Sequence, residues 1–336
     1  KLIDQLLLEK DGTLLKTHLG ANTLLGISLA CVRAAAQFEQ EPLYKYLHPT
    51  KENFLLPVPL MNIINGGAHG SNDLDIQEFM IVPFGFDTFK DALRAGCEIF
   101  YCLKQKLKSK SYSIAVGDEG GFTPNFRSHH EALDFIVSAI EETGYSKQVG
   151  LALDCAASEF YKKKRYHFES KKISSQDLID IYKKWVKSYN IISIEDGLSE
   201  EDWSGWKSLT EQLGDKIQLV GDDLFVTQKK RLEQGLENKI ANSLLVKYNQ
   251  VGTITETKES IDLAKKSGYT CVISHRSGET EDTSIADLSV AWDLEQIKTG
   301  SLSRGERTAK YNRLLFIEKK LGSLGKFQGD RAFPKK

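Results

Sequence analysis

Three acidic residues, Asp154, Glu195 and Asp222, each stand directly after a short, mainly apolar run of the chain. If these runs are neighbouring strands, the three carboxylates meet, and they cannot all stay ionised without a cation. Oxygen ligands of this kind suit a hard ion such as Mg²⁺. Each carboxylate could instead cap the helix after its strand. The succession of three favours a Mg²⁺ site, with Asp196 and Asp223 as supporting or capping groups.

Two lysines, Lys247 and Lys298, end later apolar runs in the same way. A nearby positive charge or metal ion can lower the pKa of a buried lysine until it acts as a base near neutral pH. The alternative for Lys247 is a structural ion pair with one of the carboxylates. A lysine base beside Mg²⁺, which stabilises an ene-diolate, is a pattern for removing a proton next to a carboxylate. We therefore predict a reaction of this kind.

Three further features could act on a phosphorylated substrate. Arg276 and Ser277 follow another apolar run, and a guanidinium fork and a hydroxyl can hold a phosphate. A surface loop is the alternative for both. Glu119, in the turn D-E-G-G, could be a general acid if its pKa is raised, but D-E-G-G also forms ordinary solvated turns. His69 follows a glycine pair, where a plain loop residue is the alternative.

The spacing of these run-end residues indicates how they are positioned. They follow one another at intervals close to the roughly 30 residues that a strand, a helix and two loops require. Continuously apolar strands are typical of parallel sheets buried on both faces. With further strands expected near 56–64 and 77–82, the pattern favours a closed α/β barrel, whose strands end at one mouth. A doubly wound sheet is the alternative, although the chain has no Gly-rich phosphate loop.

The rest of the chain suggests three regions. Residues 1–50 are expected to be helical, and residues 51–322 to form the α/β domain. Apolar spacing predicts an amphipathic helix at 129–144. The end of the chain, 323–336, is rich in Gly and Lys and is expected to form a surface extension.

Composition excludes several classes of protein. Lys and Arg total 45 against 46 for Asp and Glu, so the basic excess of a nucleic-acid-binding protein is missing. The five cysteines are odd in number and lack a C-x-x-C pair, which favours reduced thiols and a cytoplasmic location. No apolar stretch of about 18 residues predicts a membrane span. The first residues do not resemble a signal peptide, and they lack an initiator Met.

Nine local strings resemble motifs of the enolase family and occur in the family's order. They are N-G-G-A-H at 65–69, I-Q-E-F-M at 76–80, V-G-D-E-G-G-F at 116–122, L-D-C-A-A at 153–157, S-I-E-D-G at 193–197, G-D-D-L at 221–224, N-Q-V-G-T at 249–253, S-H-R-S-G-E-T-E-D at 274–282 and Q-I-K-T-G at 296–300. The resemblance implies a TIM-like (β/α)8 barrel of enolase type, preceded by the helical remnant of an α+β domain.

The resemblance also implies an activity, the Mg²⁺-dependent interconversion of 2-phosphoglycerate and phosphoenolpyruvate. As Mg²⁺ ligands it implies the three carboxylates Asp154, Glu195 and Asp222. It implies Lys247 as the base and Glu119 as the acid, with Glu78 in support. It implies six substrate contacts: His69, Gln77, His275, Arg276, Ser277 and Lys298. The residues alone assign no role to Gln77 and Glu78.

In one respect the chain departs from the family pattern, because roughly the first ninety residues of that pattern have no counterpart. Those residues carry most of the α+β domain and a mobile loop that helps to bind a second Mg²⁺. For the full-length form the resemblance implies a homodimer or a higher homo-oligomer.

Two competing hypotheses stay open. A truncated, non-catalytic enolase could bind host proteins at the cell surface, where Lys335 and Lys336 would suit a lysine-binding partner. Another superfamily member could act on a non-phosphorylated acid. The retained catalytic residues favour an enzyme, and the S-H-R-S and D-E-G-G strings favour a phosphorylated substrate.

Overall fold

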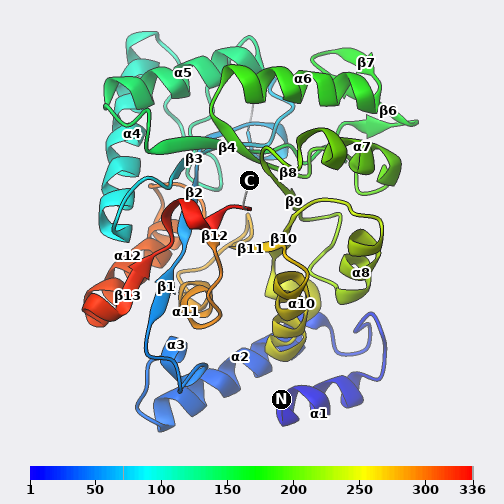
Figure 1. Ribbon diagram of the computed structural model, residues 1–336, viewed down its shortest axis with the longest axis vertical. Coiled ribbons are helices and arrows are strands. Elements are labelled where there is room, and N and C mark those ends of the chain that lie inside the picture. Colours follow the sequence, from blue (N-terminus) through cyan, green and yellow to red (C-terminus); the bar gives the residue numbers. More distant parts are fainter. Residues whose placement is uncertain (71, 335–336) are drawn as a thin grey trace.

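The structure, a computed structural model, describes residues 1–70 and 72–334. Within these residues eight strands close into a barrel, in the order β10-β11-β12-β2-β3-β4-β8-β9, and helices surround it (Figure 1). The barrel strands are β2 (Val58–Asn65), β3 (Glu78–Pro83), β4 (Val149–Asp154), β8 (Ile191–Glu195), β9 (Gln218–Gly221), β10 (Ser243–Val246), β11 (Thr270–Ser274) and β12 (Gln296–Lys298). Closure of the ring confirms the predicted α/β barrel, and the doubly wound sheet is wrong.

Strand β3 differs from the simple repeat of strand and helix that the spacing suggested. It runs antiparallel to both of its neighbours, β2 and β4, whereas the other pairs around the barrel are parallel. The reason is local: after β2 the chain turns back through a 3₁₀ turn, Gly67–His69, and enters β3 without a crossover. Strand β3 therefore begins, rather than ends, at the mouth where the parallel strands end.

The helices lie outside the strands. They are α1 (Leu2–Asp11), α2 (Ala21–Phe38), α3 (Leu43–Tyr46), α4 (Phe89–Ser109), α5 (His129–Glu142), α6 (Ser175–Ser188), α7 (Trp203–Leu213), α8 (Lys229–Glu237), α9 (Tyr248–Val251), α10 (Ile254–Lys266), α11 (Ser284–Ala291) and α12 (Gly305–Leu321). Helix α6 shows how the sequence sets such an element. A capping box of Ser174 and Asp177 starts it, and its apolar stripe, which includes Tyr182 and Trp185, is buried.

The first three helices pack together on one side of the barrel, beside α10 and α11 (Figure 1). They also complete the start of α10, whose first backbone N–H groups have no partner inside the helix. Ser28 accepts from the N–H of Ile254 at 3.1 Å, and Asp4 accepts from the N–H of Thr255 at 3.0 Å. We propose a domain boundary near residue 50, after these helices. Within the described residues, no helix is long and apolar enough to cross a membrane.

The end of the chain is packed against the barrel rather than extended at the surface. Strand β13 (Gly325–Phe327) pairs in parallel with β1 (Phe54–Leu56), and Phe327 and Ala332 are buried. The carbonyl of Ala332 accepts a hydrogen bond of 2.7 Å from the buried side chain of Gln296. The Gly and Lys content had suggested a surface extension, but the backbone can pair with β1 without apolar side chains. The predicted extension also includes residues 335–336, which lie outside the described part of the chain.

A small antiparallel sheet, β5 (Tyr161–Lys162), β6 (Arg165–Phe168) and β7 (Lys171–Ile173), stands between β4 and α6. It packs through Tyr166 and Phe168, which are buried, while its basic residues face outwards. Its outer turn matters for the site, because Glu169 in that turn contacts the loop that leads into β3.

Candidate functional site

The side chain of Lys298 lies at the centre of the barrel mouth, among acidic residues from three other strands. Its ammonium donates to Asp154 Oδ2 at 2.7 Å and to Glu195 Oε1 at 2.9 Å, and lies 3.1 Å from Glu78 Oε1. All four residues are at most 4% exposed. Burial opposes the charge on Lys298, but Asp154, Glu195 and Glu78 outweigh it and raise its pKa well above the ordinary value. The lysine therefore remains a cation.

Lys247, directly after β10, forms an ion pair with Asp222, which also accepts from the Gln250 amide at 3.3 Å. Burial acts to lower the pKa of Lys247, but Asp222 and Glu195 oppose burial and the pKa is raised. In this state Lys247 is protonated and is not a base. A second cation that engaged Asp222 would remove the main cause of the raised pKa.

The three predicted metal ligands all lie at the mouth, but they are not gathered around one point. Among the described residues, the groups whose ligand atoms lie within 4.8 Å of one another are His69–Glu78–Glu119 and Asp196–Asp222–Asp223. Of the predicted ligands only Asp222 belongs to either group. Each of the three carboxylates contacts a lysine instead: Lys298 contacts Asp154 and Glu195, and Lys247 contacts Asp222.

The donor set nevertheless fits a hard divalent cation. Burial and then the charge of Asp154 raise the pKa of Glu195 well above its ordinary value, so Lys298 does not fully compensate these acids. Glu195 Oε2 is buried and has no hydrogen-bond partner in the part of the chain that the structure describes. Carboxylate oxygens are the ligands that Mg²⁺ prefers. Asp154, Glu195 and Asp222 could therefore hold such an ion.

Asp196, which follows Glu195, has a different task. Its carboxylate accepts from the backbone N–H groups of Asp222 and Asp223, at 2.9 and 2.8 Å. These two bonds fix the turn after β9 and hence the direction of the Asp222 side chain.

Glu119 lies in a buried pocket beside two histidines. Its Oε2 accepts from the Asn62 amide at 2.9 Å, and its Oε1 lies 3.4 Å from His275 Nε2 and 3.5 Å from His69 Nδ1. Burial acts to raise the pKa of Glu119, but His275, Lys298 and His69 outweigh it and lower the pKa to about 2. In this state Glu119 is a carboxylate. It could act as an acid only if a nearby anionic ligand raised its pKa enough for it to take up a proton.

The turn around Glu119 needs its glycines. Gly120 has φ +85°, a left-handed conformation that disfavours other residues, and a Cβ on Gly121 would overlap Asn65 and the backbone at Ile63. The carbonyl of Glu119 accepts from the N–H of Ser301 at 2.8 Å. The D-E-G-G string is thus a tight turn held at the mouth, and Glu119 is 2% exposed.

Glu78 and Gln77, to which the residues alone assigned no role, reach the mouth because β3 is antiparallel. Glu78 is the first residue of β3 and pairs in register with Asp154, the last residue of β4. Burial and then the charge of Glu119 raise the pKa of Glu78 well above its ordinary value. The only local sign of this position is an acid at the start of an apolar run, a position that capping residues also occupy.

Arg276 and Ser277 stand at the rim and are exposed, while the preceding His275 is 2% exposed. Arg276 Nη1 lies 3.5 Å from Asn249 Oδ1. The rim therefore offers an exposed guanidinium and hydroxyl above the acids and lysines of the mouth. Such an arrangement suits a small anion with a phosphate at the rim and a carboxylate deeper in the barrel.

His129, at the start of α5, holds the loop that leads into Gln77 and Glu78. Its Nε2 accepts from the backbone N–H groups of Asp75 and Ile76, at 2.9 and 3.2 Å. Its Nδ1 therefore carries the proton and donates to Glu169 at 2.9 Å. The imidazole is 1% exposed and stacks on Phe168, with ring centroids 4.6 Å apart.

Replacing His129 with Phe is expected to lower the free energy of unfolding by about 1–3 kcal/mol, because two backbone N–H groups, one of them buried, lose their acceptor. The substitution keeps the aromatic stacking. His129→Gln, whose amide oxygen reaches a similar point, should recover part of the loss. Urea unfolding of both variants measures this, and equal stability of His129→Phe and the parent chain would contradict the role.

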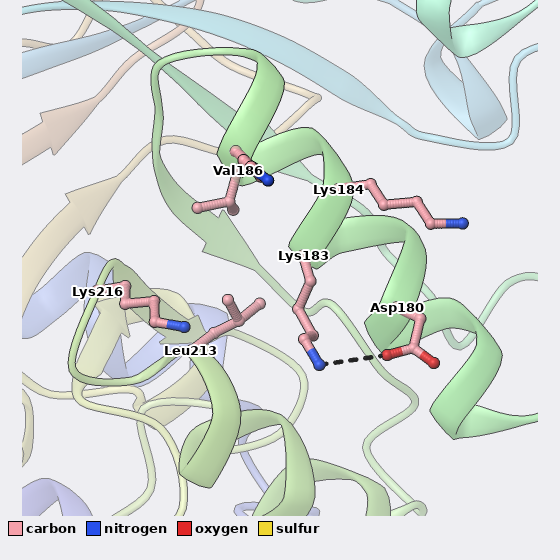
Figure 2. A pocket seen from close by; sticks show the side chains of 7 residues that line it. Asp180, Lys183, Lys184, Val186, Leu213 and Lys216 are labelled. Carbon is pink, nitrogen blue, oxygen red and sulfur yellow. Dashed lines mark hydrogen bonds and ion pairs between the residues drawn. The ribbon is translucent and has the colours of Figure 1, made fainter.

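A basic groove on the outside of the barrel is separate from this site (Figure 2). It is lined by residues of α6, α7 and the turn after α7: Asp180, Lys183, Lys184, Val186, Lys187, Leu213 and Lys216. Lys183 Nζ lies 3.4 Å from Asp180 Oδ1, while Lys184 points away from Leu213 (Figure 2). None of the predicted site residues lines this groove, so the barrel mouth is the candidate site.

Comparison with known protein families agrees with the fold. A family model described as the enolase C-terminal TIM barrel domain matches residues 53–336. A second, described as the enolase N-terminal domain, matches residues 1–47. Together the two matches extend over nearly the whole chain.

Proposed function

The chain belongs to the enolase family, and on this premise we propose that it interconverts 2-phosphoglycerate and phosphoenolpyruvate in a Mg²⁺-dependent hydro-lyase reaction. Membership of the family supports a lyase-type enzyme that acts on a small molecule. The specific reaction is supported by one observation above all. Three carboxylates, the buried Lys298, the half-buried Lys247 and a glutamate between two histidines meet at one barrel mouth, beneath an exposed arginine.

In this proposal Asp154, Glu195 and Asp222 hold the Mg²⁺. When bound, the ion supplies positive charge that stabilises an ene-diolate. Binding would also relieve the ion pairs that now hold the lysines. Lys298 would then be free to contact the substrate carboxylate, and Lys247 would lose the acid that raises its pKa.

The remaining groups would carry the proton transfers. Lys247 removes the proton from the carbon next to the carboxylate, and Glu119 gives a proton to the departing hydroxyl, so that water leaves and a C=C bond forms. Glu78, close to both Lys298 and His69, supports Glu119 through the charge around it. Phosphoglycerate carries several negative charges, which would raise the pKa of Glu119 towards a usable acid.

The substrate contacts follow from position. Arg276 and Ser277 at the rim would hold the phosphate, while His69, Gln77 and His275 would line the path between rim and metal. In line with the family resemblance, we propose a homodimer or higher homo-oligomer and a cytoplasmic location. Lys335 and Lys336, on which the host-protein hypothesis drew, lie outside the described residues.

The test is conversion of 2-phosphoglycerate to phosphoenolpyruvate by this chain, followed by absorbance. We expect turnover with Mg²⁺ and its loss with a chelator, restored when excess Mg²⁺ is added. Non-phosphorylated hydroxy acids in the same assay should give none, and turnover of these alone would identify another superfamily reaction. A folded chain that binds Mg²⁺ but converts none of these acids would contradict the proposal and favour the non-catalytic alternative.

A further inference from the structure

A buried arginine, Arg307, lies behind the site on helix α12 and is 1% exposed. Among the described residues its nearest ion-pair partner is Glu306 Oε1, 3.9 Å from Nε, which is too far for a hydrogen bond. Its guanidinium instead donates four hydrogen bonds to residues of two loops: to His275 Nδ1 at 2.6 Å, and to the carbonyls of Arg276 at 2.7 Å, Asp118 at 2.9 Å and Ser277 at 2.6 Å.

These bonds decide which nitrogen of His275 carries the proton. A guanidinium has only donors and does not lose its charge in proteins. Because Arg307 donates to Nδ1, that nitrogen must be the acceptor, and the proton of the neutral imidazole must be on Nε2. Nε2 lies on the other side of the ring, 3.4 Å from Glu119 Oε1. It has no hydrogen-bond partner among the residues that the structure describes.

The charge state agrees with this geometry. Burial lowers the pKa of His275 to about 3; Glu119 acts in the opposite direction, and Arg307 adds to the lowering. The imidazole is thus neutral near neutral pH, and it carries its single proton on either Nδ1 or Nε2.

We propose that Arg307 is a positioning residue, which holds His275 as the Nε2–H tautomer and ties the loop of the proposed acid to the loop of the proposed phosphate ligands. His275 then presents a fixed N–H donor towards Glu119 and any oxygen bound beside it. The consequence for turnover rests on the proposed function, whereas the tautomer does not.

The competing explanation is that Arg307 only holds the two loops together. The two explanations differ in where the proton of His275 lies once Arg307 is removed. Under the structural explanation, loss of Arg307 changes stability but leaves the imidazole proton where it was. Under the positioning role, loss of Arg307 frees Nδ1 to take a proton. The nitrogen spectrum of His275 therefore separates them.

The first measurement is ¹⁵N NMR of the histidine-labelled chain at neutral pH, with His275→Gln to assign the signals of residue 275. We expect a protonated Nε2 and an unprotonated Nδ1 in the parent chain. A protonated Nδ1 would overturn the inference. This result does not depend on activity, so it stands apart from the outcome of the turnover assay.

The second measurement uses Arg307→Met and Arg307→Lys, with folding checked by circular dichroism. We expect a mixture of tautomers in Arg307→Met and a fall in kcat/KM of about 10²-fold, the size of effect that small displacements of reacting groups produce. Arg307→Lys keeps the charge but not the fork, so it should recover only part of the loss.

Arg313→Met is the matched control, because Arg313 lies on the same helix but pairs with Asp287 at 2.7 Å, away from the mouth. It should leave the tautomer and turnover unchanged. A folded Arg307→Met with the parent's tautomer would overturn the positioning role. If Arg307→Met does not fold, the parent spectrum and Arg307→Lys still decide.

Discussion

Replacing Lys247 with alanine is expected to lower kcat for 2-phosphoglycerate by about 10³-fold, within the range that a general base contributes. The ammonium of Lys247 pairs with Asp222 at the mouth and lies among buried groups. No other described residue that ends a barrel strand is a lysine except Lys298, which is held by Asp154 and Glu195. Among the lysines that the structure describes at the strand ends, Lys247 is therefore the candidate base.

Two measurements make this prediction specific. Exchange of the substrate's carbon-bound hydrogen with solvent should vanish together with turnover, because the base acts before the hydroxyl leaves. Lys216→Ala, at an exposed lysine of the outer groove (Figure 2), should retain both. If the Lys247→Ala variant still exchanges the carbon-bound hydrogen of the substrate at the rate of the parent chain, another group is the base.

The barrel and most of its mouth could be predicted because of strand direction. In parallel strands an apolar run and the polar residue that ends it give both the strand and its end at the mouth. Asp154, Glu195, Lys298 and the residues after β9 and β10 follow this rule. Their identities and their places at the ends of apolar runs are therefore enough to indicate a common site.

Glu78 could not be found in this way. It begins its strand, and it reaches the mouth only because β3 is antiparallel. The direction of β3 depends on how the chain turns back between Asn65 and Glu78, and the apolar pattern of a strand does not indicate its direction. Here the family resemblance supplied a role that the residues alone had not.

Arg307 was missed for a different reason, although a signal existed. The buried stripe of α12 is formed by residues 307, 310, 311, 314, 317 and 321, and two of these six are cations. A charged residue on an apolar stripe rarely stays buried unless it is bonded. The charges on that stripe mark Arg307 and Lys310 as residues with partners behind the site.

The pairing of the acids with the lysines also could not be predicted from the sequence. The chain indicated that carboxylates and lysines meet, but not whether the lysines would face the substrate or neutralise the carboxylates. In the structure the lysines contact the carboxylates. Lys298 in particular stands where it competes with any metal ion for Asp154 and Glu195.

Replacing Lys298 with methionine is therefore expected to change two properties in opposite directions. Affinity for Mg²⁺ should rise, because the competing cation, 2.7 Å from Asp154 Oδ2 and 2.9 Å from Glu195 Oε1, is gone. Stability without metal should fall by about 3–5 kcal/mol, as happens when one partner of a buried ion pair is removed. Turnover should also be lost, because Lys298 is proposed to hold the substrate carboxylate.

Calorimetric titration with Mg²⁺ and thermal unfolding with and without the ion measure both effects. Saturating Mg²⁺ should raise the melting temperature of Lys298→Met more than that of the parent chain, since tighter binding to the folded state adds more stability. Glu195→Gln should weaken Mg²⁺ binding, and Lys106→Met, at an ion pair on α4 remote from the mouth, should leave Mg²⁺ affinity unchanged. If Lys298→Met binds Mg²⁺ more weakly than the parent, the lysine does not compete with the ion, and the ligands assigned to the metal are wrong.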